Sequence, residues 1–267
     1  MALAHDLTTL ALEIAREAGE LARRRRTEGV AIAATKSALA DIVTEADREV
    51  EDLIRARLSA ARPDDGFLGE ETGAERGVSG ITWVVDPIDG TVNYAYGIPA
   101  YAVSIAAVTG EPAPATWEAI AGAVFNPAMG ELFHATIGEG AWLDDQRIAV
   151  NAEPWPAGAL LATGFGYDPS THAGDLARVA RVMPLARDLR RIGAASLDLA
   201  YVAAGRLDGY FERGLQPWDH AAGALIVREA GGITGGSEGG RPGNAMTIAA
   251  PPALYETLLA AAIGDTH

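Results

Sequence analysis

Apolar side chains recur at helical spacing in two segments near the start of the chain. The first pattern comprises Leu3, Leu7, Leu10, Ile14, Ala18 and Leu21. It predicts an amphipathic helix over residues 4 to 26. A second pattern predicts a helix from Glu45 to about Ala60. Thr44 and Asp47 stand where a capping box places its N-cap and N3 residues, which marks the start of this second helix.

Five apolar or β-branched segments follow the second helix, separated by Gly, Pro and Asp residues that favour turns. They cover residues 66–69, 81–85, 102–109, 117–125 and 131–137. Their lengths and the turn residues between them predict an antiparallel or mixed sheet.

Past about residue 150, short apolar strands alternate with helical patterns, which indicates an α/β arrangement. The strands are expected near residues 159–163, 187–192, 208–212 and 245–249. Residues 151–158 contain two prolines and are predicted to join an N-terminal α+β domain, residues 1–150, to a C-terminal α/β domain, residues 151–267. The glycine-rich segment 231–243 contains neither common phosphate-binding motif and is predicted to be a flexible surface turn.

Composition narrows the class of protein. Hydrophobic residues make up 49% and charged residues 21% of the 267 positions, which is typical of globular proteins. The chain has no cysteine, so disulfides, thiolate metal ligands and a cysteine nucleophile are excluded. Charged residues interrupt the apolar positions between Leu3 and Leu21, so no signal peptide, membrane span or membrane partner is predicted, and a cytoplasmic location is expected.

The charge balance is acidic, with 21 Lys and Arg against 36 Asp and Glu, a formal net charge of −15. Such a surface repels a phosphate backbone, so direct binding of nucleic acid is disfavoured. The basic run Arg23 to Arg26 closes the first predicted helix, where cations complement the helix dipole.

The most informative segment is 83–91, an apolar strand followed by two acids, Asp86 and Asp89. Pro87 is expected to stop the hydrogen-bond ladder of the strand, and Gly90 to let the backbone approach a ligand. Two carboxylates about 4 Å apart repel by about 4 kcal/mol at an effective dielectric of about 20, so they need cations or raised pKa values. Mg²⁺ is the simplest cation for oxygen ligands. An ordinary Asp-Pro and Asp-Gly turn explains the same residues equally well.

Two further acidic segments have alternative explanations as well. Glu70 and Glu71 follow a short apolar strand, but a Glu-Glu pair is usually a solvated loop. Pro217 and Asp219 suit the first turn of a helix, and capping alone explains them. Spacing alone does not indicate that these acids converge.

Four motifs together resemble the inositol monophosphatase family, in its order and spacing and over essentially the whole chain. They are Lys36-x4-Asp41-Ile-Val-Thr-x2-Asp47, Gly69-Glu70-Glu71, Asp86-Pro-Ile-Asp89-Gly-Thr91-x-Asn93 and Trp218-Asp219-x-Ala-Ala222. Segments 163–166 and 209–212 are most similar to the bacterial branch of this magnesium-dependent, lithium-sensitive phosphatase superfamily. The resemblance implies a layered α-β-α-β-α sandwich of the sugar phosphatase type.

The resemblance also implies two to three Mg²⁺ ions per subunit. Glu70, Asp86 and the Ile88 carbonyl would hold one ion, and Asp86, Asp89 and Asp219 a second. A third, weaker site would lie near Glu70.

The resemblance further assigns roles around these ions. Thr91, oriented by Asp47 and assisted by Glu70, would activate a water molecule for attack on phosphorus. Lys36 and Glu71 would lie behind the ligands. The substrate would contact Asp89, Gly90, Thr91, Gly193, Ala194, Ala195, Glu212 and Asp219. Glu212 would bind vicinal hydroxyls, which points to a phosphorylated polyol.

The leading substrate is therefore myo-inositol 1-phosphate. Histidinol phosphate, fructose 1,6-bisphosphate and adenosine 3',5'-bisphosphate are alternatives that the same metal core would serve. A protein that acts in transcription complexes through its surface is the alternative outside enzymes. The family resemblance also implies a homodimer.

Overall fold

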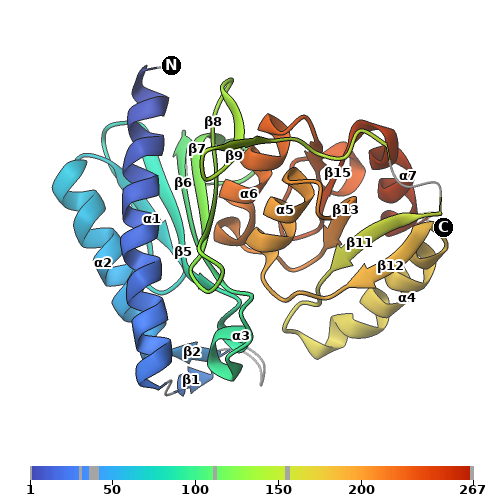
Figure 1. The fold of residues 1–267 in the computed structure, drawn as a ribbon, viewed down its shortest axis with the longest axis horizontal. Helices are drawn as coiled ribbons and strands as arrows, with labels where there is room; N and C mark the ends of the chain where they lie inside the picture. Colours follow the sequence, from blue (N-terminus) through green and yellow to red (C-terminus); the bar gives the residue numbers. More distant parts are fainter. Residues whose placement is uncertain (1, 30–31, 36–41, 111–112, 154–156, 265–267) are drawn as a thin grey trace.

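Five layers of alternating helices and sheets make up the part of the chain that the computed structural model describes, residues 2–29, 32–35, 42–110, 113–153 and 157–264 (Figure 1). Helices α1 (Ala2–Glu28) and α2 (Glu45–Ala61) form the first layer. Both begin and end within two residues of the predicted bounds, and the backbone N–H of Thr44 donates to Asp47 Oδ2 (2.7 Å) in the expected capping box. The mixed, layered α+β fold expected from the sequence is confirmed.

The second layer is an eight-stranded sheet in the order β10-β9-β8-β7-β6-β5-β3-β4. Its strands are β3 (Gly66–Gly69), β4 (Gly73–Glu75), β5 (Ile81–Asp89), β6 (Ala102–Thr109), β7 (Glu118–Asn126), β8 (Glu131–Thr136), β9 (Gly140–Leu143) and β10 (Gln146–Ile148). The β3–β5 pair is parallel and the other pairs are antiparallel. The hairpin β1 (Ile32–Thr35) and β2 (Ile42–Thr44) and the short helix α3 (Thr91–Tyr96) lie at one end of this sheet (Figure 1).

The other three layers come from the second half of the chain. Helices α5 (Ala195–Ala203) and α6 (Pro217–Glu229) separate the first sheet from a five-stranded sheet with the order β12-β11-β13-β15-β14. The strands of this sheet are β11 (Ala159–Thr163), β12 (Ala186–Arg190), β13 (Gly209–Glu212), β14 (Ile233–Gly235) and β15 (Thr247–Ala250). Helices α4 (His172–Val182) and α7 (Pro252–Ile263) cover its outer face, and short 3₁₀ turns span Pro169–Thr171, Met183–Leu185 and Ser237–Gly239.

Three apolar cores fill the spaces between these layers. The first holds Ile14, Ile54 and Val85 between α1, α2 and the first sheet. The central core joins α5 and α6 to both sheets, and the third packs α4 and α7 against the second sheet. Successive side chains of a strand point to opposite faces of the sheet, so Val84 packs in the central core and Val85 in the first.

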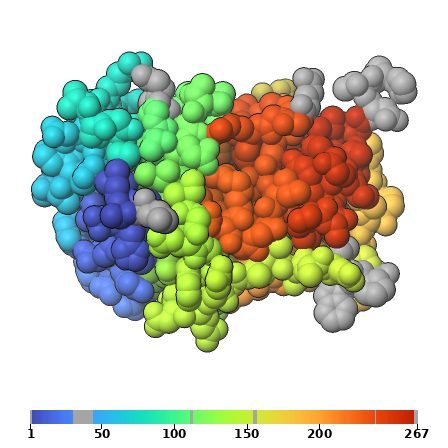
Figure 2. Space-filling model, turned by 90° about the horizontal axis from the view of Figure 1, so that it is seen from above, coloured from blue at the N-terminus to red at the C-terminus, as the bar shows by residue number. Residues whose placement is uncertain are grey.

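The halves of the chain lie side by side, with β10 ending at Ile148 and β11 beginning at Ala159 (Figure 2). The division into domains 1–150 and 151–267 stays a prediction, because the central core belongs to both halves. The predicted connection 151–158 includes residues 154–156, which lie outside the described residues.

Two local expectations are wrong. Pro87 does not end the ladder, because β5 continues to Asp89 through a shift of register against β6. The glycine-rich segment 231–243 is not all turn, because its β-branched Ile233 and Thr234 form the edge strand β14 against β15. Within the described residues, no helix combines the length and the apolar character that a membrane crossing requires.

Candidate active site

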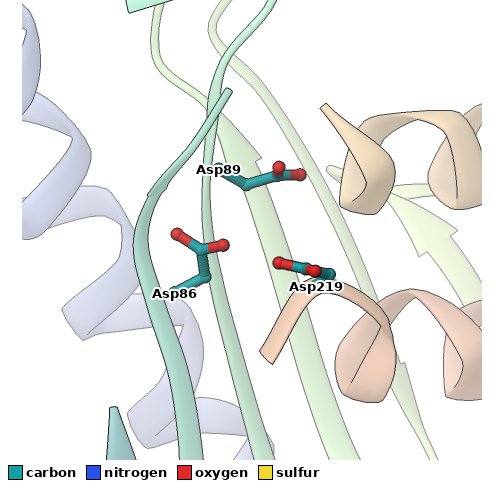
Figure 3. Close-up of side chains that lie close together, drawn as sticks. All are labelled: Asp86, Asp89 and Asp219. Atoms are coloured by element: carbon teal, nitrogen blue, oxygen red, sulfur yellow. The ribbon is translucent and has the colours of Figure 1, made fainter. Parts of the chain in front are cut away.

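Asp86 and Asp89 face the same side of β5, although residues three apart on a regular strand face opposite sides. Asp86 pairs with Ser104 and Asp89 with Ala102, so three steps on β5 match two steps on β6. This extra residue is a β-bulge, which also accommodates Pro87 because a bulge does not need its missing N–H. Ile88 points into the core beneath α1 and α2, and both carboxylates consequently turn toward α6 (Figure 3).

The first turn of α6 brings a third carboxylate to the same place. Pro217 starts the helix and Asp219 occupies N3, where its Oδ2 accepts the backbone N–H of Gln216 (2.7 Å). One oxygen each from Asp86, Asp89 and Asp219 lies within 4.8 Å of the other two (Figure 3). The sequence-predicted acids from opposite halves of the chain thus form one cluster.

Burial and mutual repulsion make this cluster unfavourable without a counterion. Burial raises the pKa of Asp86 well above its usual value, and the charges of Glu70, Asp89 and Asp219 raise it further. The pKa values of Asp89 and Asp219 are also raised, chiefly by burial. At separations up to 4.8 Å each charged pair repels by at least about 3 kcal/mol at an effective dielectric of about 20. Because the donors are carboxylate oxygens, the cluster fits a hard divalent cation.

Ser196 at the start of α5 holds one carboxylate in place. Its backbone N–H donates to Asp89 Oδ2 (2.7 Å), and so does its hydroxyl (2.5 Å). Both bonds lower the pKa of Asp89 and partly oppose the effect of its burial. Ser196 follows directly on the predicted segment Gly193 to Ala195, but no pattern in the sequence distinguishes it.

Asp47 and Thr91 form a buried hydrogen-bonded pair behind the cluster. The Thr91 hydroxyl lies 3.2 Å from Asp47 Oδ1 and 3.1 Å from the Ile88 carbonyl oxygen, so its single proton is shared between two acceptors. Burial raises the pKa of Asp47 to about 6, against the bonds that Thr44 donates. Helix capping and the positioning of Thr91 are therefore done by the two oxygens of one carboxylate.

Glu51 on α2 was missed by sequence reasoning, although it positions the Glu70–Glu71 loop. Its carboxylate accepts the backbone N–H groups of Glu71 (2.9 Å) and Thr72 (2.7 Å) and is fully buried. On a helix with many acids, nothing in the pattern distinguishes it. Glu71 itself lies 4.0 Å from the guanidinium of Arg48. Lys36 lies outside the described residues.

A cleft of about 530 Å³ opens over the cluster. The predicted residues that line it are Glu70, Asp86, Ile88, Asp89, Gly90, Thr91, Gly193, Ala194, Ala195, Glu212 and Asp219. Asp47 and Glu71 are not among its lining residues. The cleft also contains residues that were not predicted to bind, notably Arg191, Phe165 and Tyr167. The charge of Arg191 lowers the pKa of Asp89 and of Glu212. In the sequence, only its position just before the start of α5 could have indicated that Arg191 belongs to the site.

Glu212 at the end of β13 lines the same cleft and is held in place by its neighbours. Tyr210 donates its hydroxyl to Glu212 Oε2 (2.6 Å), and burial raises the pKa of Glu212 to about 7. Gly164 lies against this carboxylate so closely that a Cβ there would fall 2.0 Å from Oε2. A side chain at position 164 would therefore displace Glu212.

These raised pKa values predict that the metal-free protein loses stability as the pH rises. Asp47 and Glu212 keep their protons up to about pH 6 and 7 when folded, whereas unfolded Asp and Glu lose them near pH 4. The folded state binds more protons in this window, so its stabilisation is complete below about pH 4 and is lost through about pH 6 to 7.

Differential scanning calorimetry at about pH 5 and about pH 8, with a chelator and then with Mg²⁺, tests this expectation. We expect a lower Tm at the higher pH in chelator and a larger rise on adding Mg²⁺ there. A Tm that rises with pH in chelator would contradict it.

Comparison with known proteins adds an independent finding. The sequence model described as the inositol monophosphatase family matches residues 3–265. The protein named inositol-1-monophosphatase SuhB in Mycobacterium tuberculosis is 43% identical over 275 residues, covering 96% of this chain and 92% of that protein. The Nus factor SuhB of Haemophilus influenzae is 39% identical over 261 residues, covering 96% and 95%. The crystal structure of the extragenic suppressor protein SuhB from Bartonella henselae superposes with a TM-score of 0.88 at 38% identity, covering 96% of this chain and 98% of that one.

Proposed function

Because the chain belongs to the inositol monophosphatase family, a family of phosphoric monoester hydrolases, we propose that it converts myo-inositol 1-phosphate to inositol and phosphate. The observation that carries the proposal is the cluster of Asp86, Asp89 and Asp219 in a cleft that Glu212 also lines. The cluster suits the phosphate end of the substrate, and Glu212 suits its hydroxyl groups.

The family is metal-dependent, and we propose that this chain uses two to three Mg²⁺ ions. Asp86 would be shared between one ion, together with Glu70 and the Ile88 carbonyl, and a second, together with Asp89 and Asp219. Bound there, the ions would lower the pKa of a water molecule and neutralise charge on the phosphate. Carboxylate and carbonyl oxygens are the ligands that Mg²⁺ prefers.

Groups of the chain itself would position the attacking water and the phosphate. The Thr91 hydroxyl, bonded to Asp47, can accept a hydrogen bond from water through its lone pairs while its own proton points to the carboxylate. The backbone N–H groups of Gly90 and Thr91 would bind phosphate oxygens. Gly90 has φ +89°, and a Cβ there would meet Ala100 O at 2.9 Å, so the turn that presents these N–H groups requires glycine.

The leaving group would lie between α5 and Glu212. Gly193 has φ +90° and precedes the first turn of α5, and Ala194 and Ala195 leave room for a ring. A charged carboxylate can accept bonds from two neighbouring hydroxyls, which favours a polyol over a leaving group without hydroxyls.

Phosphate release from a panel of substrates tests this proposal. The panel comprises myo-inositol 1-phosphate, histidinol phosphate, fructose 1,6-bisphosphate and adenosine 3',5'-bisphosphate, each with Mg²⁺, with chelator and with added lithium. We expect the highest kcat/KM for myo-inositol 1-phosphate, with release abolished by chelator. A higher value for another substrate would reassign the substrate, and no release from any would leave the interaction protein as the better explanation.

Glu212→Gln tests the hydroxyl-binding role separately. We expect kcat/KM for myo-inositol 1-phosphate to fall about 10- to 100-fold, mainly through KM, because a hydrogen bond to a charged group contributes about 1.5–3 kcal/mol. Hydrolysis of p-nitrophenyl phosphate, which has no vicinal hydroxyls, should change less than about twofold. The kinetics are measured above about pH 8, where Glu212 with its pKa of about 7 is ionised in the empty cleft. Equal losses on both substrates would contradict the assignment.

A role in a transcription complex is a second candidate, because a 39% identical relative is named a Nus factor. The net charge of −15 favours contact with protein rather than directly with RNA. The homodimer and the cytoplasmic location expected from the sequence stay predictions.

A further inference from the structure

A second cavity, of about 260 Å³, lies between β7 and α6 and shares no lining residue with the acidic cleft. Its walls include Trp117, three alanines and two prolines. Its polar groups are Glu118, His220, Arg228, Thr234 and Arg241. This combination of apolar walls with a few convergent polar groups is typical of a small-molecule site.

Two buried polar atoms of residues that line this cavity have no hydrogen-bond partner among the described residues. They are Nε2 of His220, whose side chain is only 2% exposed, and Oγ1 of Thr234. Buried polar atoms are almost always paired, because an unpaired one keeps its full desolvation cost. Both atoms belong to the wall of the cavity, and a rotation of either side chain would present it to an occupant that offers oxygen atoms.

The charges around the cavity are unbalanced toward positive. Arg228 and Arg241 both approach the single carboxylate of Glu118, at 3.4 Å each. Arg241 also donates to the backbone carbonyl of Trp117. Each guanidinium carries five N–H donors, so donors remain for another acceptor, and one positive charge has no counterpart among these three side chains. This arrangement favours an anion on a chain whose net charge is −15.

We propose that this cavity binds a small organic oxyanion, a carboxylate or phosphate with an apolar body, through Arg228, Arg241, Thr234 and His220. The groups named can all donate hydrogen bonds, so acceptor oxygens complete them. Trp117 and the alanines would contact the apolar body. The volume lies below the range of about 300–1,000 Å³ for drug-sized ligands, which favours a single ring or a short chain over a nucleotide or peptide.

Nuclear magnetic resonance titration of the full chain tests the proposal, with the Trp117 indole N–H signal assigned by Trp117→Phe. The probes are benzoate, phenylphosphonate and the uncharged benzamide. We expect at least one anion to shift the Trp117 signal with a dissociation constant on the order of 1 mM, whereas benzamide leaves it unmoved. Whichever anion binds more tightly identifies the head group.

Arg241→Gln and Thr234→Val provide the variants, and Arg190→Gln is the matched control because Arg190 is an exposed arginine on β12. We expect binding to weaken about tenfold or more in Arg241→Gln, more modestly in Thr234→Val, and not at all in Arg190→Gln. Unchanged phosphate release shows that the variants fold. Three results would each overturn the proposal. Benzamide could bind as tightly as the anions, or both cavity variants could keep the wild-type affinity. The third result is no shift with either anion, which is expected of a cavity that holds only water.

Discussion

Replacing Asp86 by Asn is expected to lower kcat/KM for phosphate release by about a thousandfold or more. Asp86 is the carboxylate proposed to be shared by two ions, and the amide keeps its shape but removes its charge. The same change should stabilise the metal-free protein, because it removes the cost of burying a carboxylate, or the proton that neutralises it, beside Glu70, Asp89 and Asp219. Activity and metal-free stability are therefore expected to change in opposite directions.

Kinetics with saturating Mg²⁺ and calorimetry in chelator measure the two effects. A gain of 1 kcal/mol raises Tm by about 2–4 °C in a chain of this size. Asp188→Asn is the matched control, since Asp188 is an exposed aspartate on β12 and should leave both quantities unchanged. Wild-type activity in Asp86→Asn would contradict the proposal that the protein is an enzyme. A lower Tm of this variant in chelator would contradict the expected stabilisation of the metal-free protein.

Replacing Thr91 by Val is expected to lower kcat about 100-fold with little change in KM, because a positioned proton acceptor contributes about 10²- to 10⁴-fold. Valine keeps the branched shape but cannot bond to Asp47 or to water. Thr91→Ser should recover most of the activity, which a purely structural role of the methyl group would not allow. Thr109→Val is the matched control, because its hydroxyl contacts only the Glu118 carbonyl within the described residues.

Asp47→Asn separates positioning from folding. Asn retains an oxygen for the Thr44 N–H but loses the charge that fixes the Thr91 proton. We expect a similar loss in kcat and a changed pH profile at its acidic side, because the Asp47 pKa of about 6 no longer contributes. An unchanged profile with unchanged kcat would contradict the proposed pair.

Long periodic segments could be predicted from the sequence, and short ones could not. The 27 residues of α1 repeat their apolar positions many times, whereas β9 and β10 have four and three residues. Their hairpin turns at Asp144, which has φ +50°, and although Asp favours turns, the strands on either side are too short to mark a hairpin. Periodicity needs repeats, and these strands are too short to supply them.

The acids of the site were visible in the sequence, but their convergence was not. Asp219 meets Asp86 through the packing of α6 against the first sheet, a contact between distant parts of the chain that no local pattern encodes. Only the family resemblance placed them together. Glu51 and Ser196 were missed because each acts through hydrogen bonds to backbone or carboxylate that exist only in the folded chain.

The bulge in β5 decides on which side of the sheet Asp89 lies. Removing Pro87 would match two steps on β5 to two on β6, and regular alternation would then keep Asp86 and Asp89 on the side of α6 and Ile88 under α1 and α2. A regular strand that kept all four residues would instead turn Asp89 under α1 and α2, so the second carboxylate reaches the site only because this strand carries one residue more than its neighbour.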